Sequence, residues 1–545
     1  MGIEQQAERV AREALGLDEL RPGQLEAMTA LAQGRDTLVV MPTGGGKSAI
    51  YQVPALMLDG PTLVVSPLIA LQRDQAQALR ERDEQAVRLD ADTSKGERAS
   101  SFESLRAGAA EFLFCAPEQL ARPDVVRELA AAHPSLLVVD EAHCVSAWGY
   151  DFRPDYLRLG AVADALGRPV VAALTATAAP PVRAEIAERL RMRDPLEVVC
   201  GFDRPNIDLE VRRATGDGED VAETVEALVS GGHPTLEPPG KPGLVYTATR
   251  KRTGELAARL GGRTAAYHAG MRRADRDAVQ EAFMAGDLDV VVATSAFGMG
   301  IDKPDVRFVV HAQVPGSLDS YYQEIGRAGR DGEPAASVLF YRPEDLGLQR
   351  FFTGGLPGED ALAAVARALA EEGGHTGRKD LRERLGLTAR RLTSLLNLLE
   401  KAGAVRLGTR TVTAAEDAPS PEEAARAARE VAERHREVER TRLEMMRRYA
   451  ETRDCRRGFL LGYFGERLPG PCGHCDTCRA GTASSPEPVR GVRFPVHARV
   501  EHVEWGPGEV IRRDEDRLTV LFHESGYREL LLSAVLAEDL LHESG

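Results

Sequence analysis

Two long stretches of the sequence alternate short apolar runs with amphipathic segments, and this alternation constrains the fold more than any other feature. Between residues 36 and 200 the apolar runs are DTLVVM, PTLVVS, FLFCA, SLLVVD, VVAAL and LEVVC. The pattern stops at GFDRPN (201–206) and resumes with GLVYTA, TAAYHA, DVVVAT, RFVVHA and SVLFY. Runs rich in valine and leucine at such spacing are typical of parallel sheets covered by helices on both faces. The sequence therefore predicts two parallel-sheet α/β domains in series, residues 1–205 and 206–350.

The chain changes character after about residue 355, where strand-like runs give way to helical patterns. A helical segment at 360–372 is followed by a short helix, a turn at Gly386, and a longer helix that runs into a strand at 404–413. This order is typical of a winged helix-turn-helix. We therefore predict a winged-helix-like domain over residues 357–415.

The end of the chain divides into two further units. A long charged helical segment leads into four clustered cysteines, which predicts a helical metal-binding module over residues 418–482. Residues 483–492 have the composition of a linker. From residue 493 the sequence alternates like short strands, with Gly506-Pro507-Gly508 as a predicted turn. A small β-barrel over residues 493–545 is the fold that this pattern favours.

Bulk properties place the chain among globular proteins. Its 545 residues predict three to five domains, at roughly 100–200 residues each. No apolar run approaches the roughly 18 residues of a membrane span, and the N-terminus lacks the apolar core of a signal peptide, so we expect a cytoplasmic location. The net charge of −15 argues mildly against nucleic-acid binding, but the local field of a groove decides that question.

A glycine-rich segment between a strand and a helix predicts a triphosphate site. The segment reads MPTGGGKS, from Met41 to Ser48, and follows the strand DTLVV. Glycines let backbone amides curl around phosphates, Lys47 reaches the terminal phosphates, and Ser48 supplies a ligand for Mg²⁺. Met41 stands where the general pattern has its first glycine. The predicted ATP-binding residues of this loop are Thr43, Gly44, Gly45, Gly46, Lys47 and Ser48.

An acidic pair at the end of a strand complements this site. Asp140 ends the strand LLVVD and is predicted to hold Mg²⁺, directly or through water. Glu141 is then placed to orient the water that attacks the terminal phosphate. Such a pair is weak evidence alone, but it follows a phosphate loop here.

A second group of polar residues lies in the second α/β domain. The segment YYQEIGRAGRDG brings together Gln323, Arg327 and Arg330. We expect its arginines to reach across a cleft between the domains to the γ-phosphate, as arginine fingers do. A surface turn with solvated arginines is the alternative.

Four of the seven cysteines form a metal-binding pattern, C-x16-C-x2-C-x2-C. Four thiolates surround Zn²⁺ tetrahedrally at about 2.3 Å. The C-x2-C-x2-C run also fits an iron–sulfur spacing, which stays open as an alternative. No open ligand position is implied, so the site is expected to be structural, and His474 is a spare ligand. The predicted metal ligands are Cys455, Cys472, Cys475 and Cys478.

The stretch after the acidic pair, SAWGYDFRPDY, carries several aromatic rings in a loop-like composition. Trp148, Tyr150, Phe152 and Tyr156 fall within nine residues of a chain that is only 5% aromatic. Stacking of a base on an aromatic ring is worth roughly 1–3 kcal/mol and tolerates any sequence. We expect Trp148, Tyr150, Phe152 and Arg153 to contact single-stranded nucleic acid, with Trp148 and Arg153 the strongest candidates. The alternative is that Phe152 and Tyr156 pack the loop onto its own domain.

Taken in order, these segments resemble a known family. MPTGGGKS, SPLIALQRDQ, CAPEQL, DEAH, LTATA, FGMGIDKPDV and QEIGRAGRDG resemble the motifs of superfamily two helicases, and more narrowly those of the RecQ family. The resemblance covers about residues 12–350 and, less completely, 440–480, where DCRRGFLLGYFGE and PCGHCDTC are similar to the family's zinc module. It implies two RecA-like motor domains that bind ATP and Mg²⁺. It also implies unwinding of duplex DNA with 3′ to 5′ movement on a single strand.

The resemblance implies roles for individual residues. RPGQLEAM is similar to the family's motif before the phosphate loop, in which Gln24 would read the adenine edge with Arg21 nearby. The aromatic-rich loop would sense single-stranded DNA and, through Glu141 and His143, pass its occupancy to the hydrolytic water. Further DNA contacts are expected by motif at Arg250, His268, Thr294 and Ser295.

The C-terminal arrangement departs from the family. In the usual bacterial arrangement the zinc module follows the motor directly, then a winged helix and a small helical domain, whereas here the winged-helix segment precedes the cysteines. The tail resembles the SH3-like module that ends some UvrD-type helicases, and its acids favour a protein partner over phosphate. The winged helix is expected to dock DNA or protein through the exposed face of its second helix, namely Thr388, Arg390, Arg391, Thr393 and Asn397.

The sequence thus predicts an ATP-dependent 3′ to 5′ DNA helicase of the cytoplasm, associated with the nucleoid and active in DNA repair and recombination. An RNA helicase or nucleic-acid remodeller on the same motor is the alternative. A third hypothesis is a nucleic-acid-binding scaffold with a silent motor. The presence of Lys47, Asp140, Glu141 and Arg330 counts against it.

Overall fold

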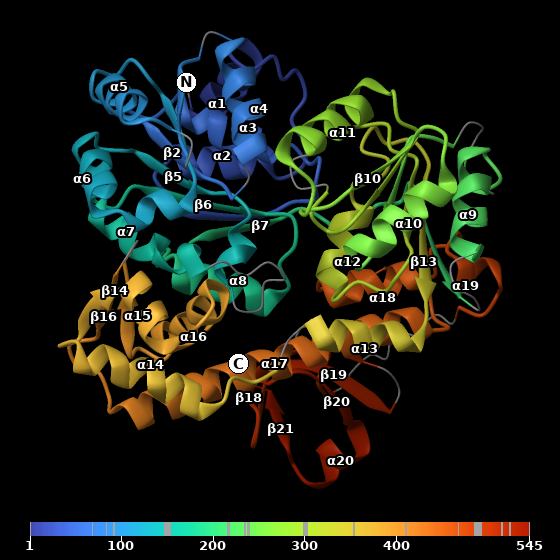
Figure 1. Cartoon of the computed structure of the whole chain (residues 1–545). Coiled ribbons are helices and arrows are strands. Elements are labelled where there is room, and N and C mark those ends of the chain that lie inside the picture. The colour runs from blue at the N-terminus through green and yellow to red at the C-terminus, as the bar shows by residue number, and fades with distance from the viewer. Residues whose placement is uncertain are drawn as a thin grey trace.

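Two α/β domains lie side by side in the computed structural model, and the C-terminal modules pack beneath them (Figure 1). Among the described residues, no helix is both long and apolar enough to span a membrane. The described residues are 2–67, 69–82, 84–90, 93–146, 154–214, 219–233, 236, 240–297, 303–352, 355–408, 411–466, 468–483, 493–496, 498–513, 516–522 and 525–543.

The first α/β domain is built on a parallel sheet whose strands are buried on both faces. Alternate residues of one strand enter two different cores: Leu38 and Val40 lie in one, Val39 in the other. In the described part of the domain the sheet has seven strands: β1 (Thr37–Val40), β2 (Thr62–Val65), β3 (Ala86–Leu89), β4 (Phe112–Cys115), β5 (Leu136–Val139), β6 (Val170–Thr175) and β7 (Leu196–Val199). Their order is β3-β4-β2-β5-β6-β1-β7. The predicted parallel sheet is confirmed, with β3 as an additional strand.

Helices cover both faces of this sheet, as a doubly buried sheet requires. They are α1 (Ile3–Glu13), α2 (Gln24–Ala32), α3 (Lys47–Ala55), α4 (Ile69–Arg80), α5 (Lys95–Arg106), α6 (Pro123–Ala131), α7 (Leu159–Ala165) and α8 (Pro180–Arg189). Short 3₁₀ turns complete the domain: η1 (Pro117–Ala121), η2 (Ala142–Val145) and η3 (Pro154–Arg158).

The second α/β domain repeats the architecture with a parallel sheet that has six strands within the described residues. Its strands are β8 (Ile207–Arg213), β9 (Gly243–Tyr246), β10 (Thr264–Tyr267), β11 (Val290–Ala293), β12 (Phe308–His311) and β13 (Ala335–Tyr341). Their order is β10-β11-β9-β12-β13-β8. The helices are α9 (Glu219–Val229), α10 (Arg250–Leu260), α11 (Arg273–Ala285), α12 (Leu318–Ile325) and α13 (Pro343–Phe352). The edge strand β8 begins directly after GFDRPN, where the sequence pattern predicted no strand.

The predicted winged-helix-like domain follows. A small antiparallel sheet, ordered β14-β16-β15, packs with three helices around a leucine-rich core. Gly386 ends the first helix of the motif with a φ of 62°, which glycine adopts without strain. The elements are α14 (Glu359–Glu371), β14 (His375–Gly377), α15 (Arg378–Leu385), α16 (Ala389–Lys401), β15 (Val405–Leu407) and β16 (Thr411–Ala414). The single strand predicted at 404–413 is a hairpin.

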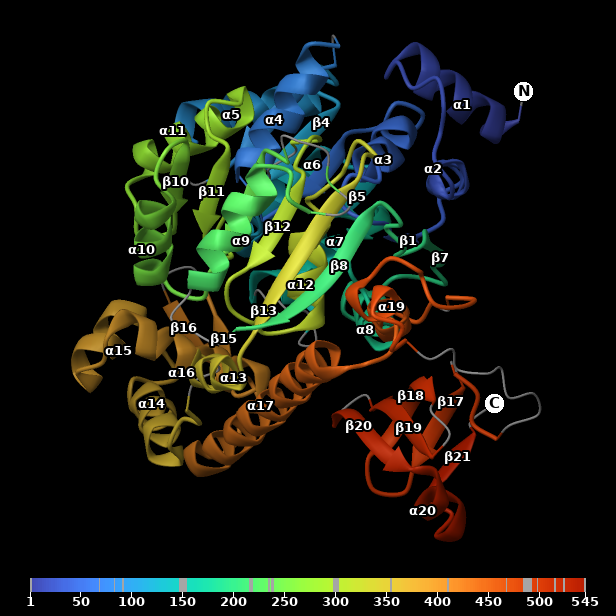
Figure 2. The same cartoon turned by 90° about the vertical axis from the view of Figure 1, so that its right-hand side faces the viewer.

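One long helix, α17 (Pro421–Glu451), runs beneath both α/β domains from the winged-helix-like domain to the four cysteines (Figure 1, Figure 2). Its N-terminus is capped by Ser420, with Glu423 completing a capping box and Pro421 at the first helical position. At 31 residues it is roughly 46 Å long. It leads into the cysteine module (residues 455–479), which holds α18 (Arg456–Tyr463) and α19 (Asp476–Arg479).

The chain ends in a small β-domain (residues 493–543). Its antiparallel strands are ordered β20-β19-β18-β17-β21. Its elements are β17 (Arg499–His502), β18 (Gly506–Arg513), β19 (Arg517–Phe522), β20 (Gly526–Leu531), α20 (Leu532–Ala537) and β21 (Leu541–Glu543). The turn predicted at Gly506-Pro507-Gly508 is wrong, because these residues pair with β17 and the chain reverses at 503–505 instead.

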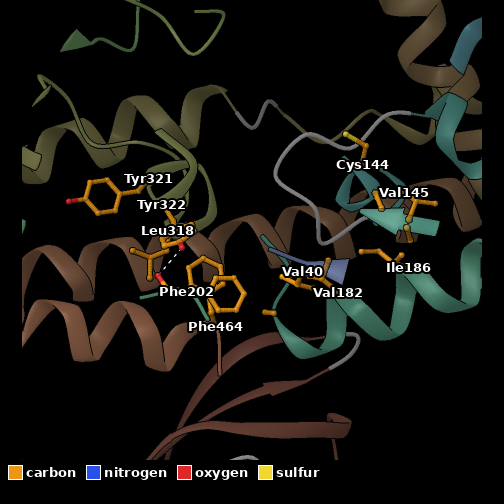
Figure 3. Close-up of a cluster of buried hydrophobic side chains, with 14 of the residues drawn as sticks. Val40, Cys144, Val145, Val182, Ile186, Phe202, Leu318, Tyr321, Tyr322 and Phe464 are labelled. Atoms are coloured by element: carbon orange, nitrogen blue, oxygen red, sulfur yellow. Dashed lines mark hydrogen bonds between the residues drawn. The ribbon is translucent and has the colours of Figure 1, made fainter. Parts of the chain in front are cut away.

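The hydrophobic cluster that holds Leu38 and Val40 extends through both α/β domains into the cysteine module and the β-domain. Phe202, between the two α/β domains, stacks on Phe464 of the segment after α18, with ring centroids 4.5 Å apart. Tyr322 of α12 contacts both rings and donates a hydrogen bond to the carbonyl of Phe202 (2.8 Å; Figure 3). The cysteine module and the β-domain are therefore packed into the same cluster as the α/β domains.

Candidate nucleotide and nucleic-acid site

The loop between β1 and α3 has the geometry of a phosphate site. Gly44 and Gly46 have φ values of 79° and 81°, a region that glycine adopts without strain. Helix α3 begins at Lys47, so its first amides point into the loop, where an anion is favoured. Lys47 Nζ donates to the carbonyls of Met41 (3.1 Å) and Pro42 (3.4 Å), which places the ammonium group over the loop.

Ser48, the predicted Mg²⁺ ligand of this loop, is held in place from the neighbouring helix. Its Oγ accepts a hydrogen bond from Gln75 Nε2 at 3.0 Å. The Gln75 amide oxygen in turn accepts one from the Tyr51 hydroxyl at 3.3 Å. Gln75 therefore orients Ser48.

The acidic pair lies at the carboxyl end of β5. Asp140 Oδ1 accepts from the Glu141 amide (3.0 Å) and Oδ2 from Ser66 Oγ (3.3 Å). Burial and then the charge of Glu141 raise the pKa of Asp140 to about 6, while Lys47 opposes the shift. A buried carboxylate beside a serine hydroxyl and a phosphate loop fits the oxygen ligands that Mg²⁺ prefers.

His143 links the acidic pair to the next strand. Its Nδ1 lies 3.3 Å from Glu141 Oε2 and 3.0 Å from the hydroxyl of Thr175, at the end of β6. The predicted neighbours Glu141 and His143 are thus in contact. Transmission of a signal through them stays a prediction.

The arginine loop (residues 326–331) of the second α/β domain lies next to the phosphate loop of the first. A methyl group added to Gly44 would lie 3.4 Å from Cγ and Cδ of Arg330, and one added to Gly326 would lie 4.0 Å from Thr43 Oγ1. Arg327 of this loop is buried, and so is Gln323, which precedes the loop in α12. The predicted approach of the second domain to the phosphate loop is present in the structure, and the roles of these side chains stay predictions.

The predicted adenine-recognition residues contact the phosphate loop. Gln24 Nε2 donates to the carbonyls of Gly45 (3.3 Å) and Gly46 (3.0 Å), and its Oε1 accepts from the Arg21 amide (2.7 Å). The Arg21 guanidinium donates to the Gly44 carbonyl. Both polar atoms of the Gln24 amide are therefore engaged by the protein in this structure.

Most of the aromatic-rich segment lies outside the described residues. Trp148, Tyr150, Phe152 and Arg153 are among those not described. Tyr156 is fully buried and its hydroxyl donates to the Asp140 carbonyl at 3.0 Å. The packing alternative is thus confirmed for Tyr156, which ties the end of this segment to the acidic pair.

The four other predicted DNA contacts lie along one edge of the second sheet. They follow the carboxyl ends of three neighbouring strands, β10, β11 and β9. Arg250 and Ser295 are exposed, and His268 and Thr294 are half-buried. The structure therefore gathers these residues on a common edge, while DNA contact by them stays a prediction.

The four cysteines form one cluster, in which all Sγ atoms lie within 4.8 Å of one another. Backbone amides of Cys472 and Gly458 donate to Cys455 Sγ, at 3.3 and 3.5 Å, as they do to metal-bound thiolates. Cys472 and Cys478 are 3.8 Å apart, which matches neighbouring ligands of tetrahedral Zn²⁺ with Zn–S near 2.3 Å. The His474 ring is 2.9 Å from an Arg457 nitrogen and is not needed as a ligand.

Sequence reasoning missed several residues that hold the predicted ones in place. Ser66, Gln75 and Thr175 stand in segments that the family resemblance had marked, so the motifs themselves were a usable signal. Arg204 and Asn206 belong to GFDRPN, which the sequence marked only as a break in the pattern. Their hydrogen bonds are with backbone carbonyls of the arginine loop, and such bonds have no sequence signature.

Comparison with known families agrees with this geometry. The DEAD/DEAH box helicase family matches residues 21–185, the helicase conserved C-terminal domain matches 222–332, and the RecQ zinc-binding domain matches 416–479. The fold and site define a superfamily two helicase motor with an attached zinc module. The zinc-binding match and the geometry of the cluster assign Zn²⁺ to the four cysteines.

Relatives identify the family. The chain is 41% identical over 339 residues to the "Probable ATP-dependent DNA helicase RecS" of Bacillus subtilis, covering 61% of this chain and 66% of that protein. It is 34% identical over 468 residues to the ATP-dependent DNA helicase RecQ of the same species, covering 85% and 65%. The chain belongs to the RecQ family, and it spans just under two thirds of the length of these relatives.

A solved structure shares the fold. The DUF1998 helicase MrfA bound to DNA superimposes with a TM-score of 0.52 at 19% identity, over 76% of this chain and 60% of that one.

The three family matches leave the winged-helix-like domain and the β-domain outside their ranges.

Proposed function

We propose that this chain is an ATP-dependent DNA helicase that moves 3′ to 5′ on single-stranded DNA and unwinds duplexes in DNA repair and recombination. The observation that carries the proposal is the close approach of the arginine loop to the phosphate loop, with the stem of Arg330 against Gly44. Separation and closure of the two α/β domains at this contact during ATP turnover would convert hydrolysis into movement.

The side chains divide the chemistry among them. Lys47 and the first amides of α3 would bind the terminal phosphates, and Asp140 with Ser48 would hold Mg²⁺, which would supply positive charge to offset that of the phosphates. Glu141 would align the attacking water. Arg327 and Arg330, with Gln323 beside them, would stabilise the charge on the transferred phosphoryl group.

The nucleic-acid path is proposed to follow the carboxyl edge of the second sheet and the aromatic-rich segment. Arg250, His268, Thr294 and Ser295 offer cationic and hydroxyl groups suited to phosphates, which carry no sequence information. Rings at Trp148, Tyr150 and Phe152 would stack on bases, with Arg153 beside them.

A strand-displacement assay tests the function. Forks and duplexes with a 3′ or a 5′ single-stranded tail are incubated with ATP and Mg²⁺. We expect the 3′-tailed duplex and the fork to be unwound, the 5′-tailed duplex to stay intact, and Lys47→Ala to unwind none. Preferential ATPase stimulation by single-stranded RNA would support the RNA helicase alternative, and ATP-independent binding alone would support the silent scaffold.

We also propose that the β-domain binds a protein partner, and that the chain works in the cytoplasm at the nucleoid. Three large apolar side chains of the β-domain are exposed to solvent: Val503 (68%), Leu531 (49%) and Leu536 (46%). Exposed apolar groups favour a protein surface over phosphates. Substitution of Val503 by Asp should weaken partner capture in a pull-down without changing ATPase activity.

A further inference from the structure

The short interdomain segment (residues 201–206) makes a dense set of hydrogen bonds to the arginine loop. The Arg204 guanidinium donates to three carbonyls of the loop: Gly326 (3.2 Å), Ala328 (2.7 Å) and Gly329 (2.9 Å). The first two carbonyls bracket Arg327 in the chain, and the third directly precedes Arg330. One half-buried guanidinium therefore fixes the backbone on both sides of Arg327 and immediately before Arg330.

Asn206 completes this support. Its Nδ2 donates to the carbonyls of Gly329 (2.7 Å) and Glu333 (2.9 Å). Gly329 has a φ of 55°, and a methyl group there would lie 2.4 Å from Asn206 Nδ2, so the close approach depends on glycine. The turn between Arg327 and Arg330 is thus shaped by Asn206 and by its own glycine.

Arg204 forms no ion pair within the described part of the chain. No carboxylate lies within 4.0 Å of its guanidinium among the residues that the structure describes. Carbonyl oxygens of the arginine loop are the acceptors for its donors. A planar fork with fixed donor directions suits this task, and a lysine would supply charge without the same geometry.

The cysteine module supports the interdomain segment from the opposite side. Arg457 of α18 donates through Nη2 to the carbonyls of Arg204 (3.2 Å), Pro205 (3.2 Å) and Ile207 (3.0 Å). Its Nη1 contacts His474, between the zinc ligands Cys472 and Cys475, at 2.9 Å. A continuous series of contacts therefore leads from the zinc site through Arg457 and the interdomain segment to the arginine loop.

We propose that Arg204 and Asn206 are positioning residues for the arginine finger, and that Arg457 transmits the position of the zinc module to them. The inference rests on the proposed ATP hydrolysis and adds to it a reason why the zinc module is packed behind the motor. Arg204 and Asn206 act on the loop backbone. Arg327 and Arg330 remain the groups that would meet the phosphate.

Steady-state ATP hydrolysis tests this with Arg204→Ala, Arg204→Lys and Asn206→Ala. A displacement of about 1 Å at a catalytic group costs roughly 100-fold in rate. We expect kcat to fall about 100-fold in Arg204→Ala and about 10-fold in Asn206→Ala, with partial rescue in Arg204→Lys. The KM for ATP should stay within about twofold in all three. Arg213→Ala, an exposed arginine at the far end of β8, is the matched control and should hydrolyse ATP at the wild-type rate.

Two further readouts separate positioning from general damage. Affinity for ADP with aluminium fluoride should fall by the same factor as kcat, whereas affinity for a non-hydrolysable ATP analogue should not change. In a double-mutant cycle, Arg204→Ala should add little to the loss caused by Arg330→Ala, because both remove the same interaction. The assignment would be overturned if the fold-losses in kcat of the two single variants multiplied in the double variant. A raised KM for ATP at unchanged kcat would overturn it as well.

The zinc link is tested with Arg457→Lys. In Arg457→Lys protein that retains one Zn²⁺ per chain, kcat should fall while the KM for ATP stays unchanged. An unchanged kcat would mean that the zinc module does not act on the arginine loop. If Arg204→Ala loses its zinc or the circular-dichroism spectrum of the folded protein, the positioning role is tested with Asn206→Ala instead. A wild-type chain that does not hydrolyse ATP would contradict the proposed function itself. Normal hydrolysis in both wild type and Asn206→Ala would contradict the positioning role.

Discussion

Glu141 adopts a backbone conformation that few side chains accept. Its φ of 49° and ψ of 46° lie in the left-handed region, which costs on the order of 1–3 kcal/mol for a residue other than glycine. The turn directs its carboxylate to His143 and gives its amide hydrogen to Asp140. Such strain is retained where geometry serves chemistry, which agrees with a role for Glu141 at the reacting phosphate.

Replacement of Glu141 by Gln tests that role. The side chain keeps its size and the backbone turn, but it loses the charge that aligns and polarises water. We expect ATP hydrolysis to fall by roughly 10²–10⁴-fold, the range for a general acid–base group. Binding of a fluorescent ATP analogue should be retained. Turnover above a tenth of the wild-type rate would exclude Glu141 from the reaction.

Trp148 is predicted to stack on single-stranded DNA. Trp148→Ala should keep the basal ATPase rate but lose its stimulation by single-stranded DNA, since a stacking platform worth roughly 1–3 kcal/mol per base is removed. The measurement is ATPase rate against the concentration of oligonucleotide. Unchanged stimulation would place the DNA contact elsewhere in the segment.

Residues with a local signature could be predicted, and residues with a purely tertiary role could not. Lys47, Asp140 and the four cysteines were found because glycine-rich loops, strand-end acids and cysteine spacing are local patterns. Arg204 was missed because its acceptors are carbonyls more than 120 residues away. Every residue has a backbone carbonyl, so the sequence does not show which carbonyl accepts a hydrogen bond.

At the scale of elements, the strands missed in the two sheets lie at sheet edges. β3 is the first strand in the order of the first sheet, and β8 is the last in the second. Edge strands are covered on fewer sides, so AVRL and IDLEVRR carry arginines and acids in place of a continuous apolar run. The central strands, buried along most of their length, were all recognised from their apolar runs.

Helix α16 of the winged-helix-like domain presents its N-terminal half to solvent. Thr388 caps the helix by accepting from the Arg391 amide (3.2 Å), whereas Arg390, Arg391 and Thr393 are exposed and Asn397 is half-buried. We predict that Arg390→Ala/Arg391→Ala weakens duplex binding and lowers the slope of log affinity against log salt by about 2, because each arginine would neutralise one phosphate. Fluorescence anisotropy at several salt concentrations measures both. Arg384→Ala, whose guanidinium is already paired with Glu371 and Glu372, is the matched control.

Unchanged affinity in the double variant would favour the alternative for this face, a protein-docking role. The winged-helix-like domain, which here precedes the zinc module, would then have a different role from the winged helix in the family's usual arrangement.

The cysteine module is expected to depend on its metal. Structural zinc sites contribute folding free energy directly, so chelation should unfold the segment from Cys455 to Cys478. The ion pair of Arg479 with Asp208 and the hydrogen bond from the Val211 amide to Asp476 would break with it. We predict a lower melting temperature and a reduced kcat after chelation, both restored by Zn²⁺ and not by Mg²⁺. Measured metal content of one zinc and no iron excludes the iron–sulfur alternative; iron with acid-labile sulfide would reverse the assignment.

At the scale of the whole molecule, the accessory modules beneath the two α/β domains form a closed ring of contacts with them. The winged-helix-like domain is joined to the first α/β domain by the ion pair of Arg158 and Glu400 (2.9 Å). Helix α17 connects it to the cysteine module, which is bound to the second α/β domain. Arg158 ends the turn η3, two residues after the buried Tyr156, so this contact with the winged-helix-like domain is formed by the described end of that stretch of chain.

The β-domain packs against this ring through side-chain contacts and is not connected to it by the linker sequence alone. Tyr527 is buried and stacks on Tyr463 of α18, with centroids 5.1 Å apart at 22°. Arg512 pairs with Asp454 (2.7 Å), Arg528 with Glu437 (2.7 Å), and β18 also contacts α8 of the first domain. The predicted linker therefore joins two surfaces that are already in contact.

Removal of the Tyr527 ring should separate the β-domain from the ring of modules. Loss of a buried aromatic side chain costs about 3 kcal/mol or more, and here it would also expose Tyr463 and the Asp319 carboxylate that accepts a hydrogen bond from the Tyr463 hydroxyl. We therefore predict that Tyr527→Ala splits a shared thermal transition into two, with the β-domain melting separately. Leu531→Ala, at an exposed position on the same strand, should leave a single transition. Calorimetry distinguishes the outcomes, and one unshifted transition in Tyr527→Ala would mean that the ion pairs of Arg512 and Arg528 hold the domain without the aromatic stacking.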